Sequence, residues 1–113
     1  MSRSVVYLQL NSLDAFIREL ESRGIGEVRA TTWYKPDGFG QIVLKRRFTA
    51  YAPREGLILR LDVTYYRGFY YANDRDKQQV KEAYEKCVKP VEDRISQVAR
   101  LLEGEYHNGR AEW

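Results

Sequence analysis

The sequence predicts an α+β domain in which a four-stranded antiparallel sheet packs with a short N-terminal helix and a long C-terminal helix. Three observations predict this class. Residues 27–72 alternate β-branched or aromatic runs with turns that contain Pro or Gly, a pattern typical of consecutive antiparallel strands. Residues 12–24 contain a helix start signal and a helix stop signal. Apolar residues recur every three or four positions over residues 80–102, which indicates a helix with one buried face.

The N-terminal part predicts a candidate short strand followed by the short helix. VVYLQL at residues 5–10 is rich in residues that favour strands. Ser12 is a preferred N-cap residue, and Gly24 is a preferred left-handed stop. Because apolar residues recur at helical spacing between these two signals, we expect the helix at about residues 13–23.

Four strands are expected in the middle of the chain. The first three lie at residues 27–34, 41–52 and 57–66, and the turns KPDGFG and PREG separate them. FYYA at residues 69–72 follows an Arg-Gly pair and is expected to be a short fourth strand or an edge. Turns this regular indicate an antiparallel arrangement.

The C-terminal part predicts helix from Asn73 onward. NDRD supplies a cap and an acidic first turn, and an apolar stripe follows. The stripe consists of Val80, Tyr84, Cys87, Val91, Ile95, Val98 and Leu102. Pro90 interrupts it, and a proline inside a helix costs about 3 kcal/mol or more, or bends the helix. We therefore expect one long helix kinked at Pro90, or two helices that meet there. The stripe also predicts a homo-oligomer formed through this helix, and it makes Cys87 a small core residue.

The length of 113 residues suits one domain, which we place at residues 1–106, with a flexible tail at residues 107–113. The N-terminal apolar run is too short and too polar for a signal peptide or a membrane span. We expect a cytoplasmic protein without a membrane partner. Arg outnumbers Lys 13 to 6, and a composition rich in both acids and bases suits a thermophile.

The excess positive charge lies in the same segment as most of the aromatic residues. Residues 27–72 contain eight basic and four acidic residues, a net charge of +4, and ten of the fifteen aromatic residues. Side chains alternate along a strand, so one face of the sheet is apolar and takes the helices. The other face carries cations with rings between them, namely Lys45, Arg47, Tyr51, Arg60 and Tyr66. On the same alternation, Tyr65 belongs to the core.

Arg46 falls in the middle of the apolar row, where an unpaired charge would be costly. A bulge that redirects it, or a cleft that opens beside it, would explain this position. An ion pair with a helix acid such as Glu85, or a side chain that extends to solvent, would explain it equally well. The neighbouring acids Glu92 and Asp93 are expected to be solvated.

The sequence lacks the residue combinations of the common enzymes and metal sites. It has one cysteine, Cys87, and one histidine, His107, so one chain cannot form a zinc site of the usual Cys/His type. It contains neither a P-loop nor a dinucleotide-binding glycine motif. Asp62 lies among basic residues and is expected to be a salt-bridge partner. We expect no catalysis, no cofactor and no metal.

Aromatic residues interleaved with Lys and Arg on a sheet are typical of proteins that bind single-stranded nucleic acid, because rings stack on bases while cations meet phosphates. The candidate residues are Trp33, Tyr34, Lys35, Phe39, Lys45, Arg46, Arg47, Tyr51, Arg60, Tyr66, Arg67, Phe69 and Tyr70. The expected partner is single-stranded DNA or RNA, bound with little sequence preference. The alternative is an adaptor that binds another protein through the Tyr/Arg-rich face and the C-terminal helix, because Tyr and Arg also dominate protein–protein hot spots.

The layout resembles that of the archaeal ThermoDBP-related proteins. The segments that carry the resemblance are TTWYKPDGFG, LKRRFTAY and VTYYRGFYY, followed by the helix from Asn73. The resemblance lies in layout and composition over most of the chain. It implies single-stranded DNA or RNA binding, a four-stranded sheet with helices, a cleft with an apolar floor and a basic rim, and association through C-terminal helices. Pro90 is a departure from this layout, because a proline would interrupt a straight, zipper-like helix.

Overall fold

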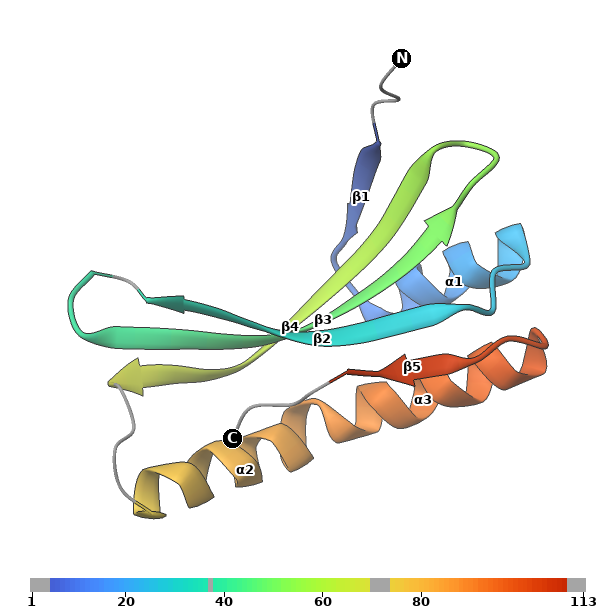
Figure 1. Ribbon diagram of the computed structural model, residues 1–113. Helices are drawn as coiled ribbons and strands as arrows, with labels where there is room; N and C mark the ends of the chain where they lie inside the picture. Colours follow the sequence, from blue (N-terminus) through green and yellow to red (C-terminus); the bar gives the residue numbers. More distant parts are fainter. Residues whose placement is uncertain (1–4, 37, 70–73, 110–113) are drawn as a thin grey trace.

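The computed structural model contains three helices and a five-stranded mixed sheet (Figure 1). It describes residues 5–36, 38–69 and 74–109. In chain order the elements are β1 (Val6–Leu10), α1 (Leu13–Arg23), β2 (Val28–Pro36), β3 (Gln41–Ala52), β4 (Leu57–Phe69), α2 (Asp74–Cys87), α3 (Lys89–Leu101) and β5 (Tyr106–Asn108). The expectation of a four-stranded antiparallel sheet with one long C-terminal helix is therefore wrong.

The sheet has the order β1-β4-β3-β2-β5. Its centre is the expected antiparallel meander of β2, β3 and β4. Both edges are parallel, because β1 pairs with β4 and β5 pairs with β2. β4 continues without a break to Phe69, so the expected separate fourth strand does not begin there; residues 70–73 lie outside the described residues.

The short β5 begins just before the predicted tail of residues 107–113. Its three residues pair with Val28, Arg29 and Ala30 of β2. Three residues are too few to show a strand pattern in the sequence. Residues 110–113 lie outside the described residues.

Helix α1 has the bounds and the caps that the sequence predicts. The Ser12 side chain accepts a hydrogen bond from the Ala15 N–H at 3.1 Å, and Gly24 ends the helix with a φ of 64°. Glycine tolerates this left-handed conformation because it has no Cβ. Phe16, Ile17 and Leu20 are buried, as their spacing indicates.

The C-terminal helical region consists of two helices, which is the second of the two expected alternatives. α2 ends at Cys87, and Pro90 is the second residue of α3. A proline in the first turn of a helix is tolerated, because its missing N–H would have had no partner in the helix. Val88 is fully buried at the junction, whereas Cys87 is exposed. The prediction that Cys87 is a core residue is therefore wrong.

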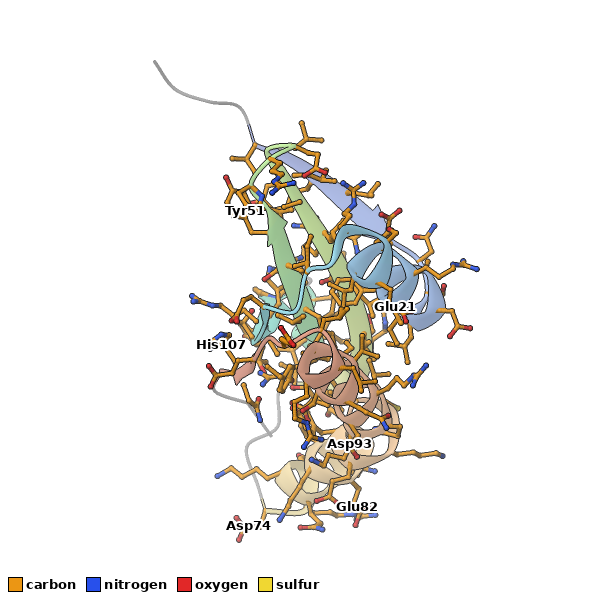
Figure 2. The ribbon with its side chains drawn as sticks, turned by 90° about the vertical axis from the view of Figure 1, so that its right-hand side faces the viewer. Glu21, Tyr51, Asp74, Glu82, Asp93 and His107 are labelled. Atoms are coloured by element: carbon orange, nitrogen blue, oxygen red, sulfur yellow. The ribbon has the colours of Figure 1, made fainter. Side chains whose placement is uncertain are left out.

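All three helices pack on the same face of the sheet. The single core cluster combines residues of α1, α2 and α3 with strand residues that lie opposite each other, such as Ala30, Phe48 and Leu61. In Figure 2, Glu21 of α1 lies on the helix side, whereas Tyr51 and His107 lie on the other side of the sheet. No helix of the described residues covers that second side, which we call the open face.

The apolar stripe of the C-terminal region faces this core. Val80, Tyr84, Ile95 and Val98 are buried against the chain's own sheet. Burial within one chain thus accounts for the stripe, and oligomerisation through the helices stays a prediction. No helix among the described residues is long and apolar enough to cross a membrane.

Candidate functional site

The open face carries an unbalanced set of charges. Strand register and side-chain alternation define its members, because directly opposed residues share a face. Its charged and aromatic side chains on the strands are Tyr7, Arg29, Trp33, Lys35, Lys45, Arg47, Tyr51, Arg60, Asp62, Arg67, Phe69 and His107. His107 apart, these include six cations and one carboxylate.

Trp33 lies on β2 beside two cations of the neighbouring strand. Lys45, directly opposite on β3, places its Nζ 5.1 Å from the Trp33 ring centroid, and Arg47 places its Cζ 5.4 Å away. Cations at this distance are attracted to the ring electrons. The arrangement places a broad aromatic ring beside two positive charges, which suits the stacking of a base next to a phosphate.

Asp62 is the one strand carboxylate on the open face, and it pairs with Arg47. The Arg47 Nε donates to Asp62 Oδ1 at 2.8 Å, and Nη2 donates to Oδ2 at 3.2 Å. This two-point contact fixes the guanidinium plane across β3 and β4. The prediction that Asp62 is a salt-bridge partner is confirmed.

Arg60 is held in place by β1 rather than by an acid. Its Nε donates to Gln9 Oε1 at 2.7 Å, and its Cζ lies 4.9 Å from the Tyr7 ring centroid. Neither contact neutralises its charge. Arg60 therefore remains a positive group on a rigid strand, with the exposed Tyr7 ring beside it.

Three further cations extend the positive surface along the sheet. Arg29, Lys35 and Arg67 are exposed. No salt bridge joins any of the three to another residue that the structure describes. They are accessible to an anionic ligand.

A depression of about 350 Å³ lies at the β5 end of the open face. Its lining comes from three strands and from the residue before β2. The lining residues are Glu27, Val28, Arg29, Thr49, Tyr51 and His107. This end differs from the rest of the surface in having the histidine, which lies beside the acid Glu27.

A β-bulge in β4 moves one predicted stacking residue, Tyr66, to the helix side. Leu44 pairs with Tyr66, but the next residue, Lys45, pairs with Thr64, so Tyr65 is an extra residue on β4. Tyr66 therefore shares the face of Leu44, and its placement beside Arg60 on the cationic face is wrong. Tyr34, another candidate residue, lies on the helix side for a different reason: it follows Trp33 on β2 and pairs with Leu44, so alternation alone turns it away from the open face. Tyr65 is buried edge-on against Tyr84, with ring centroids 5.2 Å apart, which confirms it as a core residue.

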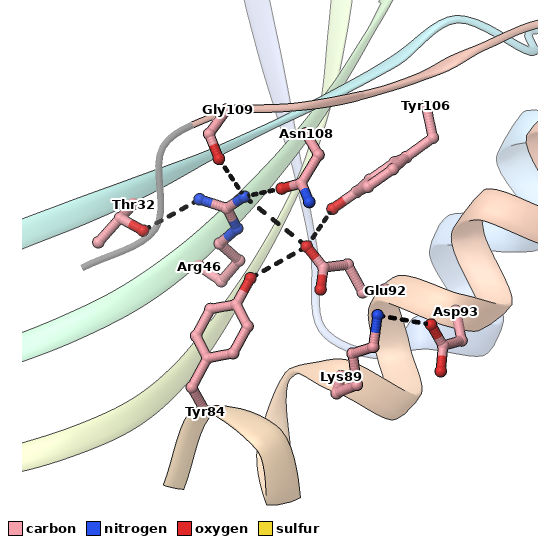
Figure 3. A network of polar contacts seen from close by, with 9 residues as sticks. All are labelled: Thr32, Arg46, Tyr84, Lys89, Glu92, Asp93, Tyr106, Asn108 and Gly109. Atoms are coloured by element: carbon pink, nitrogen blue, oxygen red, sulfur yellow. Dashed lines mark hydrogen bonds and ion pairs between the residues drawn. The ribbon is translucent and has the colours of Figure 1, made fainter. Parts of the chain in front are cut away.

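Arg46 is not on the open face. It keeps its place in the apolar row and is fully buried on the helix side, so neither redirection by a bulge nor a cleft explains it. One Nη donates to Thr32 Oγ1 at 3.0 Å, and the other donates to the Asn108 side chain and to the Gly109 carbonyl at 2.7 Å (Figure 3). Its proposed contact with phosphate is therefore not supported.

The acid that pairs with Arg46 is Glu92, whose Oε1 lies 3.7 Å from the guanidinium. The expectation of an ion pair between Arg46 and a helix acid is confirmed, but the acid is Glu92 and not the expected Glu85, which is exposed. Glu92 is 4% exposed, so its expected solvation is wrong. Oε1 also accepts from the hydroxyls of Tyr84 at 3.0 Å and Tyr106 at 2.7 Å. These bonds satisfy the buried carboxylate.

The two tyrosines in this network ionise less readily than usual. Burial raises the pKa of the Tyr84 and Tyr106 hydroxyls, and the adjacent Glu92 carboxylate raises both further. Both therefore remain neutral donors to Glu92 at neutral pH. The network joins β3, α2, α3 and β5, so it is a structural device rather than a surface site.

The other candidate residues are placed as follows. Eight of the predicted residues share the open face, namely Trp33, Lys35, Lys45, Arg47, Tyr51, Arg60, Arg67 and Phe69. Phe39 is highly exposed in the β2–β3 turn. Tyr70 lies outside the described residues. The sequence does not single out Tyr7 or Arg29, because only the register shows which way they point.

No protein-family model, curated protein or solved structure matches this chain in the comparisons with known proteins. The resemblance to the ThermoDBP-related proteins stays a prediction from layout and composition.

Proposed function

We propose that the protein binds single-stranded nucleic acid on the open face, without catalysis and with little sequence preference. The observation that carries the proposal is a sheet face whose strands place six cations and one carboxylate around exposed or half-exposed rings. The further carboxylates, Glu27 and Glu105, lie beside His107 at the β5 edge. Single strands offer both bases and phosphates, and such a surface meets both. A duplex is a poorer fit, because major-groove readers generally insert a helix or ribbon.

The roles divide by chemistry. Arg29, Lys35, Lys45, Arg60 and Arg67 would contact phosphates, and Arg47 would do so while it holds Asp62. Trp33, Tyr51 and Phe69 would stack on bases, with Tyr7 extending the surface on β1. All of these residues lie on strands of one sheet, so the surface is largely preformed.

The test is a salt series with oligo-dT and oligo-U. Affinity should fall steeply as salt rises, because bound cations displace counterions from the phosphates, with a slope of about −0.7 per phosphate for a single strand. The variant Arg29→Ala/Arg67→Ala removes two phosphate contacts and should lower the magnitude of this slope by about 1.4. The charge-matched control is Lys77→Ala/Lys81→Ala, which removes two exposed cations of α2 on the helix side.

Each result is informative. Equal effects of the two double variants would show that the charge acts without a defined surface. Absence of binding at low salt would reject the proposal and favour the protein-binding adaptor. Competition between oligo-dT and oligo-U separates DNA from RNA, because only RNA offers the 2′-hydroxyl.

A further inference from the structure

Two Gly-Glu pairs, 78 positions apart, meet at the β5 edge of the open face. Gly26 precedes Glu27 at the start of β2, and Gly104 precedes Glu105 at the start of β5. A Cβ on Gly26 would lie 2.8 Å from the backbone of Gly104, and a Cβ on Gly104 would overlap the backbone of Gly26. Only glycine permits this contact at both positions. The contact brings the two following glutamates together.

His107 completes the cluster. Its Nε2 lies 2.7 Å from Glu27 Oε2 and 4.0 Å from Glu105 Oε2. One ligand atom from each of the three residues lies within 4.8 Å of the other two. The side chains of Glu27, Glu105 and His107 are 66%, 74% and 42% exposed, so an ion has direct access from solvent.

The spacing is close to that of a metal site. Zinc binds imidazole nitrogen and carboxylate oxygen at about 2.0–2.2 Å, so its ligand atoms lie roughly 3–4 Å apart. Small rotations of three exposed side chains would produce this spacing. The rigid part of the arrangement is the backbone, because Glu105 is anchored by its carbonyl, which accepts from the Val28 N–H at 3.1 Å.

We propose that Glu27, Glu105 and His107 bind a divalent transition-metal ion, with Zn²⁺ as the best match. One imidazole and two carboxylates suit zinc, whereas Mg²⁺ and Ca²⁺ prefer oxygen ligands alone. Three protein ligands leave a coordination position open. Two of the three ligands, Glu27 and His107, also line the depression beside Arg29, Thr49 and Tyr51. The site stands independently of nucleic-acid binding.

A simpler explanation is that the His107–Glu27 hydrogen bond merely fastens β5. Glu105 distinguishes the two explanations. Its carboxylate lies 4.0 Å from His107 Nε2, too far for a hydrogen bond but near enough to bind the same ion. The exposed Cys87 thiol is a competing zinc ligand. All measurements therefore use an untagged Cys87→Ser background.

The experiment is calorimetric titration of Zn²⁺, with Mg²⁺ as the comparison ion, into the full chain. We expect one Zn²⁺ per chain and at least about tenfold weaker binding in Glu27→Gln, Glu105→Gln and His107→Gln. Glu21→Gln is the matched control, because it makes the same substitution at an exposed position of α1. Its zinc affinity should equal that of the background protein.

NMR of the His107 ring gives a second readout. Zn²⁺ should shift the ring signals of His107 in the background protein and in Glu21→Gln. Absence of stoichiometric binding overturns the proposal. So does Zn²⁺ binding that leaves the His107 ring unshifted or that all three ligand variants retain.

Discussion

Arg46 and Arg47 are neighbours on β3 with the same side chain and opposite surroundings. Arg46 is fully buried, with partners from β2, α3 and the region of β5. Arg47 points to the open face, where it contacts Trp33 and Asp62. Strand alternation alone sends one guanidinium into the core and the other to the surface. The residue type therefore does not reveal whether an arginine holds the fold or meets a ligand.

The largest expected effect is the loss of stability in Arg46→Ala. This variant leaves Glu92 as an uncompensated buried charge, which typically costs about 3–5 kcal/mol. Denaturant unfolding measures the change. The control is Lys89→Ala, which breaks the exposed ion pair between Lys89 and Asp93, the residue after Glu92 on α3. This variant should lower the free energy of unfolding by less than about 1 kcal/mol. Equal losses in the two variants would contradict the structural role of Arg46.

The second expected effect concerns the open face. Trp33→Ala should weaken binding of a single-stranded oligonucleotide by about 1–3 kcal/mol, because a base loses its stacking partner. The slope of affinity against salt should change little, since no charge is removed. Trp33→Phe should restore part of the affinity. Titration at several salt concentrations checks this, and undiminished binding by Trp33→Ala would exclude Trp33 as a stacking residue.

The third expected effect is a loss of stability at alkaline pH. The pKa values of Tyr84 and Tyr106 are raised in the folded state, so above about pH 10 the unfolded chain releases protons that the folded chain keeps. Stability is therefore complete below pH 10 and falls above it, by up to about 1.4 kcal/mol per pH unit for each tyrosine. Tyr84→Phe should reduce this slope in unfolding experiments between pH 9 and 11. An unchanged slope would exclude the contribution of Tyr84.

The smallest expected effect concerns the Arg47–Asp62 salt bridge, whose two partners should change oligonucleotide affinity in opposite directions. Arg47→Ala should weaken oligonucleotide binding a few-fold, whereas Asp62→Asn should strengthen it by a similar factor, because it removes the one strand carboxylate of the open face. Both effects should shrink at high salt. Changes in the same direction would show that the Arg47–Asp62 pair acts only by shaping the surface.

Local signals predict the local structure well. Ser12 and Gly24 define α1 because caps act within a few residues. The turns define the meander of β2, β3 and β4 for the same reason. Pro90 marks the helix junction, but the sequence leaves open whether the helix bends or restarts.

Long-range pairing accounts for what the sequence does not reveal. β5 has three residues, and its partner β2 lies more than 70 positions earlier. The bulge at Tyr65 adds one residue to β4 and reverses the face of Tyr66, which alternation cannot anticipate. Glu27, Glu105 and His107 converge only because β5 pairs with β2. The repeated Gly-Glu dipeptide was the one local signal of their contact.

The pairing of Arg46 also constrains the order of folding. The β2–β4 meander can form early, because its contacts are local. However, Arg46 finds its partners Glu92, Asn108 and Gly109 only 46 to 63 positions further along the chain. Until those residues dock, closing the core over β3 would bury a guanidinium that has its Thr32 hydrogen bond but no carboxylate partner. We therefore expect the meander to stay loosely packed until α3 and β5 dock on it. Docking of these two C-terminal segments should be the last step of folding.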